Sequence, residues 1–366
     1  MKIGIYTIHS CNNFGALLQA YALSTFLIKN GYDAELVNIM SKEAERSCHY
    51  IDKWDNLKSI ANNLFSIFNP YIHKKVKNFT CFMDELPLSK RYYCNEDYTK
   101  NPIEYDLHLV GSDQVWNVEK GLDDKFYFLP FLKSDAVKAS FASSFGNVIA
   151  AEKYEHEIKS LLKSFSKVSV REKDAEIFLN VKCGIKATNV LDPTFLLSKN
   201  DWDLISGSSP IIKGKYILYY GFDRNQECGD ILKRVKKQLG LPLIGISVST
   251  SSPYRFDRFY QEAGPIEFLN LIKNASLILT SSFHGVAFAL NFRKEFIVIN
   301  HGTRMSRMES LLSLFDMRNR IISKCDDLQE MFTHEIDYSS LNPIIDSKIL
   351  DSQNQLFNTI NNISNE

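Results

Sequence analysis

Short apolar runs alternate along this chain with longer stretches in which apolar positions recur every three or four residues. The apolar runs predict β-strands at 3–7, 34–39, 105–110, 138–146, 167–170, 189–195, 216–220, 242–248, 277–280 and 296–299. The stretches with helical spacing predict helices at 16–29, 151–165, 174–179, 227–239, 265–272 and 286–290. Because strands that alternate with helices are typical of parallel sheets, we expect an α/β protein.

The same pattern divides the chain into two units. A length of 366 residues exceeds what one core usually covers, and 197–215 has the glycine and proline content of a linker. We expect a Rossmann-like domain at 1–205, a second one at 206–340, and a terminal helix in 341–366 that returns to the first. Two doubly wound domains facing each other across a cleft correspond to the GT-B arrangement.

The segment 41–100 interrupts the alternation. It is aromatic and basic, and its apolar spacing predicts helices at 54–68 and 73–83. We interpret it as a helical insertion into the first domain. Its aromatic side chains either shape an acceptor pocket or belong to the core, and the second alternative is the more usual one.

The composition and motifs of the chain argue against several kinds of partner and cofactor. The chain has 43 basic and 43 acidic residues, so its net charge gives no reason to expect a nucleic acid partner. Its seven cysteines form no CxxC pair, which argues against a zinc site and fits a reducing cytoplasm. The first residues predict a strand rather than a signal peptide, and no run of about 18 apolar residues could span a membrane. The first strand-to-helix turn lacks a dinucleotide fingerprint, so neither NAD nor FAD is expected.

Candidate chemistry in the second unit centres on His284. It lies in the polar turn 281–285, between a buried strand and an apolar helix. Ligands of open α/β sheets bind beyond the carboxyl ends of the strands, and helix N-termini attract anions, so His284 stands where a phosphate would be held. The alternative is a histidine that belongs to the core.

Polar residues also follow the strands of the first unit. Asn13 and Gly15 open its first helix. Arg171 follows the strand at 167–170, and its guanidinium either binds a phosphate or is an ordinary charge on the surface. Asp113 is either a general base or a helix cap, and Trp116 either stacks on a sugar or packs beneath the turn. His9 and His301 follow the first and last of the predicted strands and are further candidates, although both are more simply exposed turn residues.

Six motifs together carry a resemblance to a known family. They are NFGA at 13–16, VGSDQVWN at 110–117, FASSFG at 141–146, VREKD at 170–174, LDPT at 191–194 and SSFHG at 281–285. In this order and spacing the chain resembles the polysaccharide pyruvyl transferase family, from Ile3 to about Arg320.

The resemblance implies transfer of pyruvate from phosphoenolpyruvate (PEP) onto two hydroxyls of a sugar, with a galactose 4,6-ketal as a common product, in capsule or exopolysaccharide synthesis. It implies no cofactor or metal, since PEP is a co-substrate. It also assigns PEP binding to Arg171 and to the triplet Ser282, Phe283 and His284. From the chemistry of the reaction we expect His284 to be a phosphate ligand or general acid, and Asp113 to be the base on the acceptor side. For the acceptor sugar we expect Asn13, Gly15, Asp113, Gln114, Trp116 and Ser144.

One position departs from the family pattern. Some relatives have arginine where Ser282 stands, so a phosphate contact has to come from elsewhere. Arg293, Lys294, Arg304 and Arg307 are the candidates to replace it. We also expect His284→Ala and Arg171→Ala to abolish turnover and leave the fold intact, because both residues are predicted at an exposed sheet edge.

The acceptor is not defined by the sequence. A repeat unit linked to a lipid diphosphate such as undecaprenyl diphosphate would place the protein in the cytoplasm at the inner face of the membrane, docked through 53–77. Two other classes stay open. A sugar-nucleotide glycosyltransferase would share the fold but normally has a nucleotide motif after Tyr216, and a non-catalytic glycan-binding protein would use the aromatic residues of 41–100.

Overall fold

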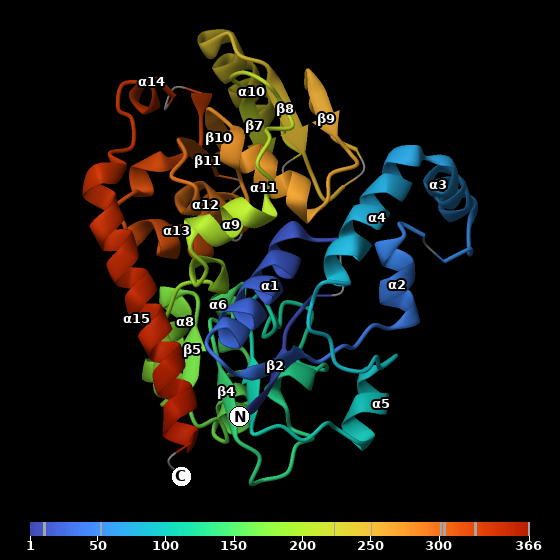
Figure 1. Cartoon of the computed structure of the whole chain (residues 1–366), viewed down its shortest axis with the longest axis vertical. Helices are drawn as coiled ribbons and strands as arrows, with labels where there is room; N and C mark the ends of the chain where they lie inside the picture. Colours follow the sequence, from blue (N-terminus) through green and yellow to red (C-terminus); the bar gives the residue numbers. More distant parts are fainter. Residues whose placement is uncertain are drawn as a thin grey trace.

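Two parallel β-sheets form the two halves of the molecule (Figure 1). This computed structural model describes residues 1–9, 12–51, 53–222, 224–249, 251–300, 302, 305–325 and 328–364. The strand order is β2-β1-β3-β4 in the N-terminal half and β12-β11-β10-β7-β8-β9 in the C-terminal half. The paired strands run parallel in both sheets, which confirms the predicted α/β class.

The strands are short and mostly buried. Those of the N-terminal half are β1 (Lys2–Tyr6), β2 (Asp33–Leu36), β3 (Leu107–Val110), β4 (Lys138–Ser140), β5 (Val168–Val170) and β6 (Ala187–Asn189). Parallel bridges at Ala139–Lys167 and Ser143–Val170 extend this sheet from β4 to the β5–β6 pair. Those of the C-terminal half are β7 (Ile217–Tyr220), β8 (Leu243–Ile246), β9 (Arg258–Tyr260), β10 (Leu277–Thr280), β11 (Phe296–Ile299) and β12 (Ile321–Ile322).

Both sheets are doubly wound. Strand addition changes direction between β1 and β3 in the first sheet and between β7 and β10 in the second. Side chains that follow the carboxyl ends of such strand pairs converge in a crevice, which is the usual ligand site of these sheets. The turns after β3 and β10 carry Asp113 and His284, two of the residues singled out from the sequence.

Helices connect the strands and cover both sheets. In the N-terminal half they are α1 (Phe14–Lys29), α6 (Val148–Glu152), α7 (Glu155–Leu162) and α8 (Lys173–Ile177), with the short turns η1 (Phe126–Phe128), η2 (Phe178–Cys183) and η3 (Pro193–Phe195). Helix α9 (Lys199–Ile205) leads into the C-terminal half, which has α10 (Gln226–Leu239), α11 (Pro265–Asn274), α12 (Phe283–Asn291), α13 (Ser306–Ser313), η4 (Arg318–Arg320) and α14 (Leu328–Met331).

The two halves share a hydrophobic core. The ring of Phe14, at the start of α1, stacks on Phe268 of α11 with centroids 4.8 Å apart and planes 6° from parallel. Phe268 in turn contacts Phe288 of α12 edge to face. Aromatic packing of this kind fixes the orientation of α1 relative to α11 and α12, so the floor between the halves is filled rather than open.

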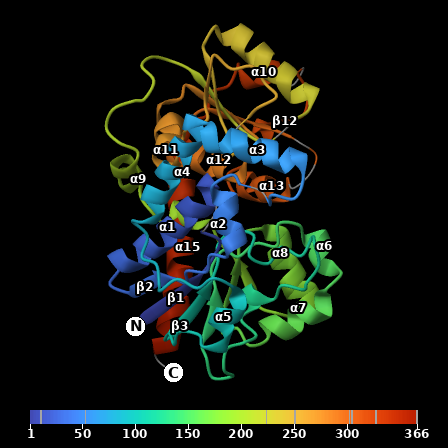
Figure 2. The same cartoon turned by 90° about the vertical axis from the view of Figure 1, so that its right-hand side faces the viewer.

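The insertion forms α2 (Lys42–Cys48), α3 (Leu57–Phe68), α4 (Pro70–Met83) and α5 (Asn95–Lys100). Its helix α4 links the halves (Figure 2). Phe79 packs on Phe14, and the buried ammonium of Lys75 donates to the carbonyl oxygens of Ser247 and Val248 at 2.6 and 3.0 Å. Burial lowers the pKa of Lys75 to about 7.

The last helix, α15 (Tyr338–Ser364), runs along both halves (Figure 1). Near its start, the Tyr338 hydroxyl donates to the carbonyl oxygen of Lys294 in the C-terminal half. Farther along, Ser352 accepts from the backbone N–H of Leu191, and Phe357 contacts Phe26, both in the N-terminal half. No helix within the described residues is both long and apolar enough to cross a bilayer.

Three segments differ from the sequence-based expectation. Helix α12 begins at Phe283 instead of 286, because the extended backbone of Ser282 already serves as its N-cap. The strand expected at 138–146 ends at Ser140, and Ala142 takes a positive φ of 53° that a strand cannot accommodate. The strand expected at 189–195 gives way to the turn η3 at Pro193, which has no N–H to donate to a sheet.

Candidate active site

A cavity of about 750 Å³ lies where the two sheets change direction. Its wall combines both halves of the chain. The N-terminal half contributes Asn13, Asp113, Gln114 and Glu119, and the C-terminal half contributes, among others, Tyr220, Arg224, Ser282, Phe283, His284 and Arg307. Six of the residues predicted for the site therefore line one cavity, with Arg307 as a seventh from the group of further candidates. This size suits a small anionic donor together with part of an acceptor.

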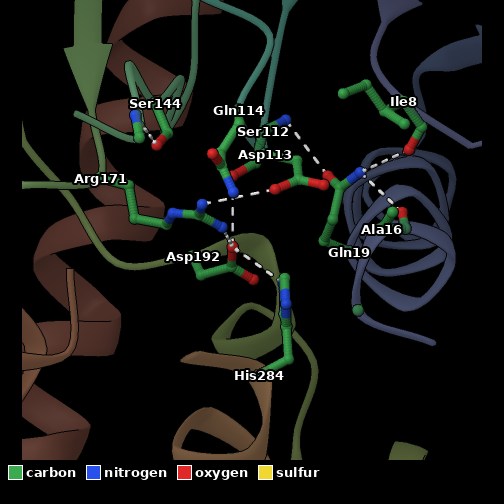
Figure 3. A network of polar contacts seen from close by, with 12 residues as sticks. Ile8, Ala16, Gln19, Ser112, Asp113, Gln114, Ser144, Arg171, Asp192 and His284 are labelled. Carbon is green, nitrogen blue, oxygen red and sulfur yellow. Dashed lines mark hydrogen bonds and ion pairs between the residues drawn. The ribbon is translucent and has the colours of Figure 1, made fainter. Parts of the chain in front are cut away.

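Arg171 does not line the cavity, and its guanidinium lies between Asp113 and Asp192 (Figure 3). Its side chain is 1% exposed, and its guanidinium stacks over the Phe283 ring at 4.4 Å. It pairs with Asp192 at 2.7 Å and with Asp113 at 3.5 Å. Burial disfavours its charge, but the neighbouring carboxylates outweigh burial and raise its pKa. Arg171 is thus neither a surface arginine nor exposed at the sheet edge, and both of those expectations are wrong.

Asp192 organises the polar side of the site and was missed as a functional candidate. Its Oδ2 accepts from Arg171 and from the Ser112 hydroxyl, while its Oδ1 accepts from the backbone N–H and hydroxyl of Thr194. Burial alone would raise its pKa, but the imidazole of His284 and the guanidinium of Arg171 hold it below the usual value. The available signal was its position directly after the apolar pair 190–191, like that of Arg171 after β5.

His284 lies in the first turn of α12, against the start of α1 from the other half. A Cβ on Gly15 would lie 2.0 Å from Nδ1 of His284, so the imidazole occupies the space that a side chain at position 15 would fill. The Nε2 atom is 3.8 Å from Asp192 Oδ2 and has no hydrogen-bond partner among the described residues. Burial lowers the pKa of His284 despite the nearby carboxylates. Burial therefore disfavours the charged form of this ring.

The turn after β3 aims two polar side chains at the cavity. Gly111 and Asp113 have positive φ values of 114° and 66°, and a Cβ on Gly111 would lie 2.4 Å from the carbonyl oxygen of Phe141. This sharp turn leaves the Asp113 side chain on the cavity wall beside Arg171. With its amide oxygen turned toward Arg307, Gln114 accepts hydrogen bonds from both terminal guanidinium nitrogens, at 2.9 and 3.3 Å.

Asn13 caps helix α1 and also lines the cavity. Its side-chain oxygen accepts from the backbone N–H groups of Gly15 and Ala16, at 3.0 and 3.3 Å, and so caps the helix. The Ser282 side chain, by contrast, makes no cap hydrogen bond to α12. First-turn N–H groups of α12 therefore remain for another acceptor, such as an anion in the cavity.

Two predicted acceptor residues lie elsewhere. Trp116 is 1% exposed, stacks on Phe128 and donates from Nε1 to the carbonyl oxygen of Tyr127. Ser144 is fully buried and donates to Glu172. Neither side chain lines the cavity, so for Trp116 the structure favours the packing alternative over a sugar platform.

The structure distinguishes between the basic residues that were candidates to replace the arginine missing at position 282. Arg293 bonds to Asn342 and Asp346 of α15, and Lys294 lies beside it, away from the cavity. Arg307 lines the cavity. Arg304 and His301 are outside the described residues. Arg224, after β7, also lines the cavity and was not anticipated, since its turn has no motif that singles it out.

His9 lines a second cavity, of about 470 Å³, within the N-terminal half. Its Nδ1 is 3.0 Å from the carbonyl oxygen of Thr7, and burial lowers its pKa. Tyr6, Glu96 and Phe126 share this cavity. His9 therefore does not reach the cavity that holds His284. Across the described residues, no group of three or more His, Cys, Asp or Glu side chains is placed to hold a metal ion.

Solved structures of similar architecture include several UDP-N-acetylglucosamine 2-epimerases. UDP-N-acetylglucosamine 2-epimerase from Rickettsia bellii has a TM-score of 0.57 at 12% identity, over 100% of this chain and 97% of that one. The Methanocaldococcus jannaschii enzyme in complex with UDP-GlcNAc and UDP has a TM-score of 0.55 at 14% identity, over 92% and 94%. The Neisseria meningitidis enzyme bound to UDP-GlcNAc has a TM-score of 0.54 at 11% identity, over 98% and 99%. Identities this low show the fold alone, and the fold is of the GT-B type.

Sequence comparison gives the family. The sequence model described as polysaccharide pyruvyl transferase matches residues 13–303, which is most of the chain. The protein belongs to the polysaccharide pyruvyl transferase family, as the six motifs predicted. No curated protein matches the sequence.

Proposed function

We propose that this protein transfers the pyruvate unit of PEP onto two hydroxyls of a sugar and releases phosphate. The observation that carries the proposal is a buried imidazole at the cavity wall that lacks a partner. Nε2 of His284 has no hydrogen-bond partner among the described residues, and Nε of Arg171, which does not line the cavity, makes no hydrogen bond either and lies 3.6 Å from Glu172. Buried polar atoms are rarely left unpaired, so a ligand with acceptor oxygens would complete the site.

The donor site would hold PEP between the halves. Arg307, Arg224 and the first-turn N–H groups of α12 supply positive charge for its phosphate. The Phe283 ring lines the cavity and stacks on the Arg171 guanidinium at 4.4 Å, so a donor that displaces this ring would approach Arg171. The anion would also raise the pKa of His284 and make it able to give a proton.

The acceptor would lie on the N-terminal wall. Asp113 faces the cavity as a carboxylate beside Arg171, which suits a base that takes a proton from a sugar hydroxyl. The first hydroxyl oxygen bonds to C2 of PEP while C3 takes a proton. The second hydroxyl then bonds to the same carbon as the C2–O bond to phosphate breaks, and its proton leaves with phosphate. The products are a cyclic pyruvate ketal and inorganic phosphate.

Phosphate release tests this proposal. Purified protein with PEP and a galactose-containing oligosaccharide should release phosphate only when both are present, and the acceptor should gain the mass of a pyruvate ketal. His284→Asn should lower kcat/KM by about 100-fold or more, because it removes a proton donor. Arg307→Gln should mainly raise the KM for PEP.

Arg318→Gln is the matched control, since Arg318 belongs to the exposed turn after α13 and lies outside the cavity. It should retain full activity. Absence of PEP binding in calorimetry, together with no phosphate release over a broad panel of galactose, glucose and mannose acceptors, would show that the proposal is wrong.

A further inference from the structure

Helix α3 differs from an ordinary surface helix because its polar face is buried and its apolar face is exposed. Its buried residues are the polar Ser59, Asn63 and Ser66. Its apolar residues face outward instead, with Leu57 exposed to 85%, Phe65 to 59% and Phe68 to 78%. A surface helix normally buries its apolar stripe, so this orientation leaves an apolar face with no cover from the described part of the chain.

The exposed face extends beyond α3. We call it the α3 surface, and it consists of Trp54, Leu57, Ile60, Leu64, Phe65, Ile67, Phe68 and Tyr71. In Figure 2 helix α3 lies on the side of the molecule turned toward the viewer, in front of α12. Contiguous apolar patches of this kind on soluble proteins mark contacts with other proteins or with membranes.

Charge distinguishes between these partners. Lys53, Lys58, Lys74 and Lys77 are exposed around the α3 surface, whereas 53–83 contains a single acidic residue, Asp55. The whole chain is balanced at 43 basic and 43 acidic residues, so this local excess is specific to the segment. An amphipathic helix flanked by lysines and aromatic residues is suited to an anionic lipid surface.

We propose that the α3 surface docks on an anionic phospholipid bilayer. Leu57, Phe65 and Phe68 enter the boundary between headgroups and acyl chains, and the lysines contact lipid phosphates. Trp54 and Tyr71, at the two ends of the surface, occupy the interface, where amphipathic rings are favoured. A second copy of the chain fits less well, because a two-fold contact would bring the same lysines against each other.

Docking would fix the orientation of the active-site cavity. Helix α4 follows α3 directly, and its Phe79 packs on Phe14, next to the cavity residue Asn13. Asn78 of the same helix donates to the carbonyl oxygen of Glu262 in the C-terminal half. The α3 surface is therefore joined through α4 to both halves of the site.

Vesicle flotation with the full chain tests docking without any need for activity. The wild type should float with vesicles of equal parts phosphatidylglycerol and phosphatidylcholine, and not with phosphatidylcholine alone. The double variant Phe65→Ser/Phe68→Ser should bind about tenfold more weakly or worse, because two large apolar contacts are lost. Lys58→Glu/Lys74→Glu should lose the preference for anionic vesicles.

Leu204→Ser is the matched control, since Leu204 is an apolar residue of α9 that is 83% exposed and lies outside the α3 surface. It should float like the wild type. Trp54 is the exposed tryptophan, while Trp116 and Trp202 are buried, so a blue shift of the emission on adding vesicles, absent in Trp54→Phe, should report insertion.

Equal flotation of the wild type and the Phe65→Ser/Phe68→Ser variant would overturn the proposal. So would a wild type that does not bind the anionic vesicles but sediments as a dimer that this double variant dissociates. That second result would assign the α3 surface to a contact between two copies. Since all substituted side chains are exposed, thermal unfolding of the variants should match the wild type, and this control excludes misfolding as the cause.

Discussion

The two halves of the chain contribute to the candidate site in different ways. The N-terminal half provides a buried ionic cluster, in which Arg171 is held by Asp192 and Asp113. The C-terminal half provides the start of α12, with the imidazole of His284, whose pKa burial lowers, and backbone N–H groups that no side chain caps. The N-terminal side supplies buried charges that are paired with one another, whereas the C-terminal side supplies a helix start and the cavity-lining residues Arg224 and Arg307.

This difference indicates that the ionic cluster contributes mainly to stability, whereas the start of α12 contributes mainly to ligand binding. Paired charges in a buried cluster are fixed before any ligand arrives, and removing one partner leaves the others unsatisfied. A helix start can accept an anion without exchanging any existing partner. Substitutions in the ionic cluster around Arg171 should therefore disturb folding as well as chemistry, and those at the start of α12 should act mainly on ligand binding.

The largest effect is expected for Arg171→Met. It leaves Asp192 buried without its guanidinium, so the free energy of unfolding should fall by about 3–5 kcal/mol and turnover should be lost. Urea denaturation and phosphate release measure the two effects. Arg320→Met is the control, because Arg320 is a buried arginine paired with Glu295 at 2.7 Å, outside the cavity. It should cost similar stability while the folded fraction stays active, and an equally inactive control would remove the distinction between the halves.

The next effect concerns pH and His108, which lies in the N-terminal sheet away from the cavity. Burial lowers its pKa from 6.5 to about 4, and its Nδ1 is 2.7 Å from the Tyr6 hydroxyl. The unfolded chain takes up this proton first, so stability is complete above pH 6.5 and is lost as the pH falls toward 4. The loss should reach about 3 kcal/mol.

His108→Gln should reduce the slope of unfolding free energy against pH by about one proton between pH 6.5 and 4. Activity measured at pH 7 should not change, because His108 does not line the cavity. An unaltered slope would mean that the pH dependence comes from His284 or His9, whose pKa values burial also lowers.

A smaller effect is expected where the two halves touch. Gly15→Ala would place a methyl group on the imidazole of His284, so we expect a loss of about 1–3 kcal/mol and reduced turnover. Gly229→Ala is the control, since a Cβ there would meet only the Tyr254 ring, at 3.3 Å, and should change stability by about 1 kcal/mol at most. Adding His284→Ala to Gly15→Ala should recover part of the lost stability. No recovery would show that the contact between the halves is not the cause.

The smallest effect is expected for Phe283→Leu. It removes the ring that lies 4.4 Å from the Arg171 guanidinium but keeps an apolar side chain in that place. Thermal unfolding should show a loss of about 1 kcal/mol, typical of a partly desolvated cation–π contact. The affinity for PEP in calorimetry should rise, because the barrier between the cavity and Arg171 becomes smaller. A lower affinity would assign the ring to the donor site itself.

The sequence predicted the α/β class and the turns that carry Asp113 and His284, because strand and helix periodicities are local and carboxyl ends of parallel strands share an edge. It did not predict that Arg171 is buried, since burial depends on Phe283, a residue far along the chain. The role of Asp192 and the packing of Trp116 were missed for the same reason: both depend on contacts between distant segments.

The path of α15 has a mechanical consequence. An α-helix is stiff along its axis, and this one is fastened to the C-terminal half at Tyr338 and to the N-terminal half at Ser352. Swinging the halves apart would require bending the helix or detaching one end of it. Helix α15 should therefore resist separation of the halves, and Pro343, which lies between the two attachment points, is where it would bend most easily.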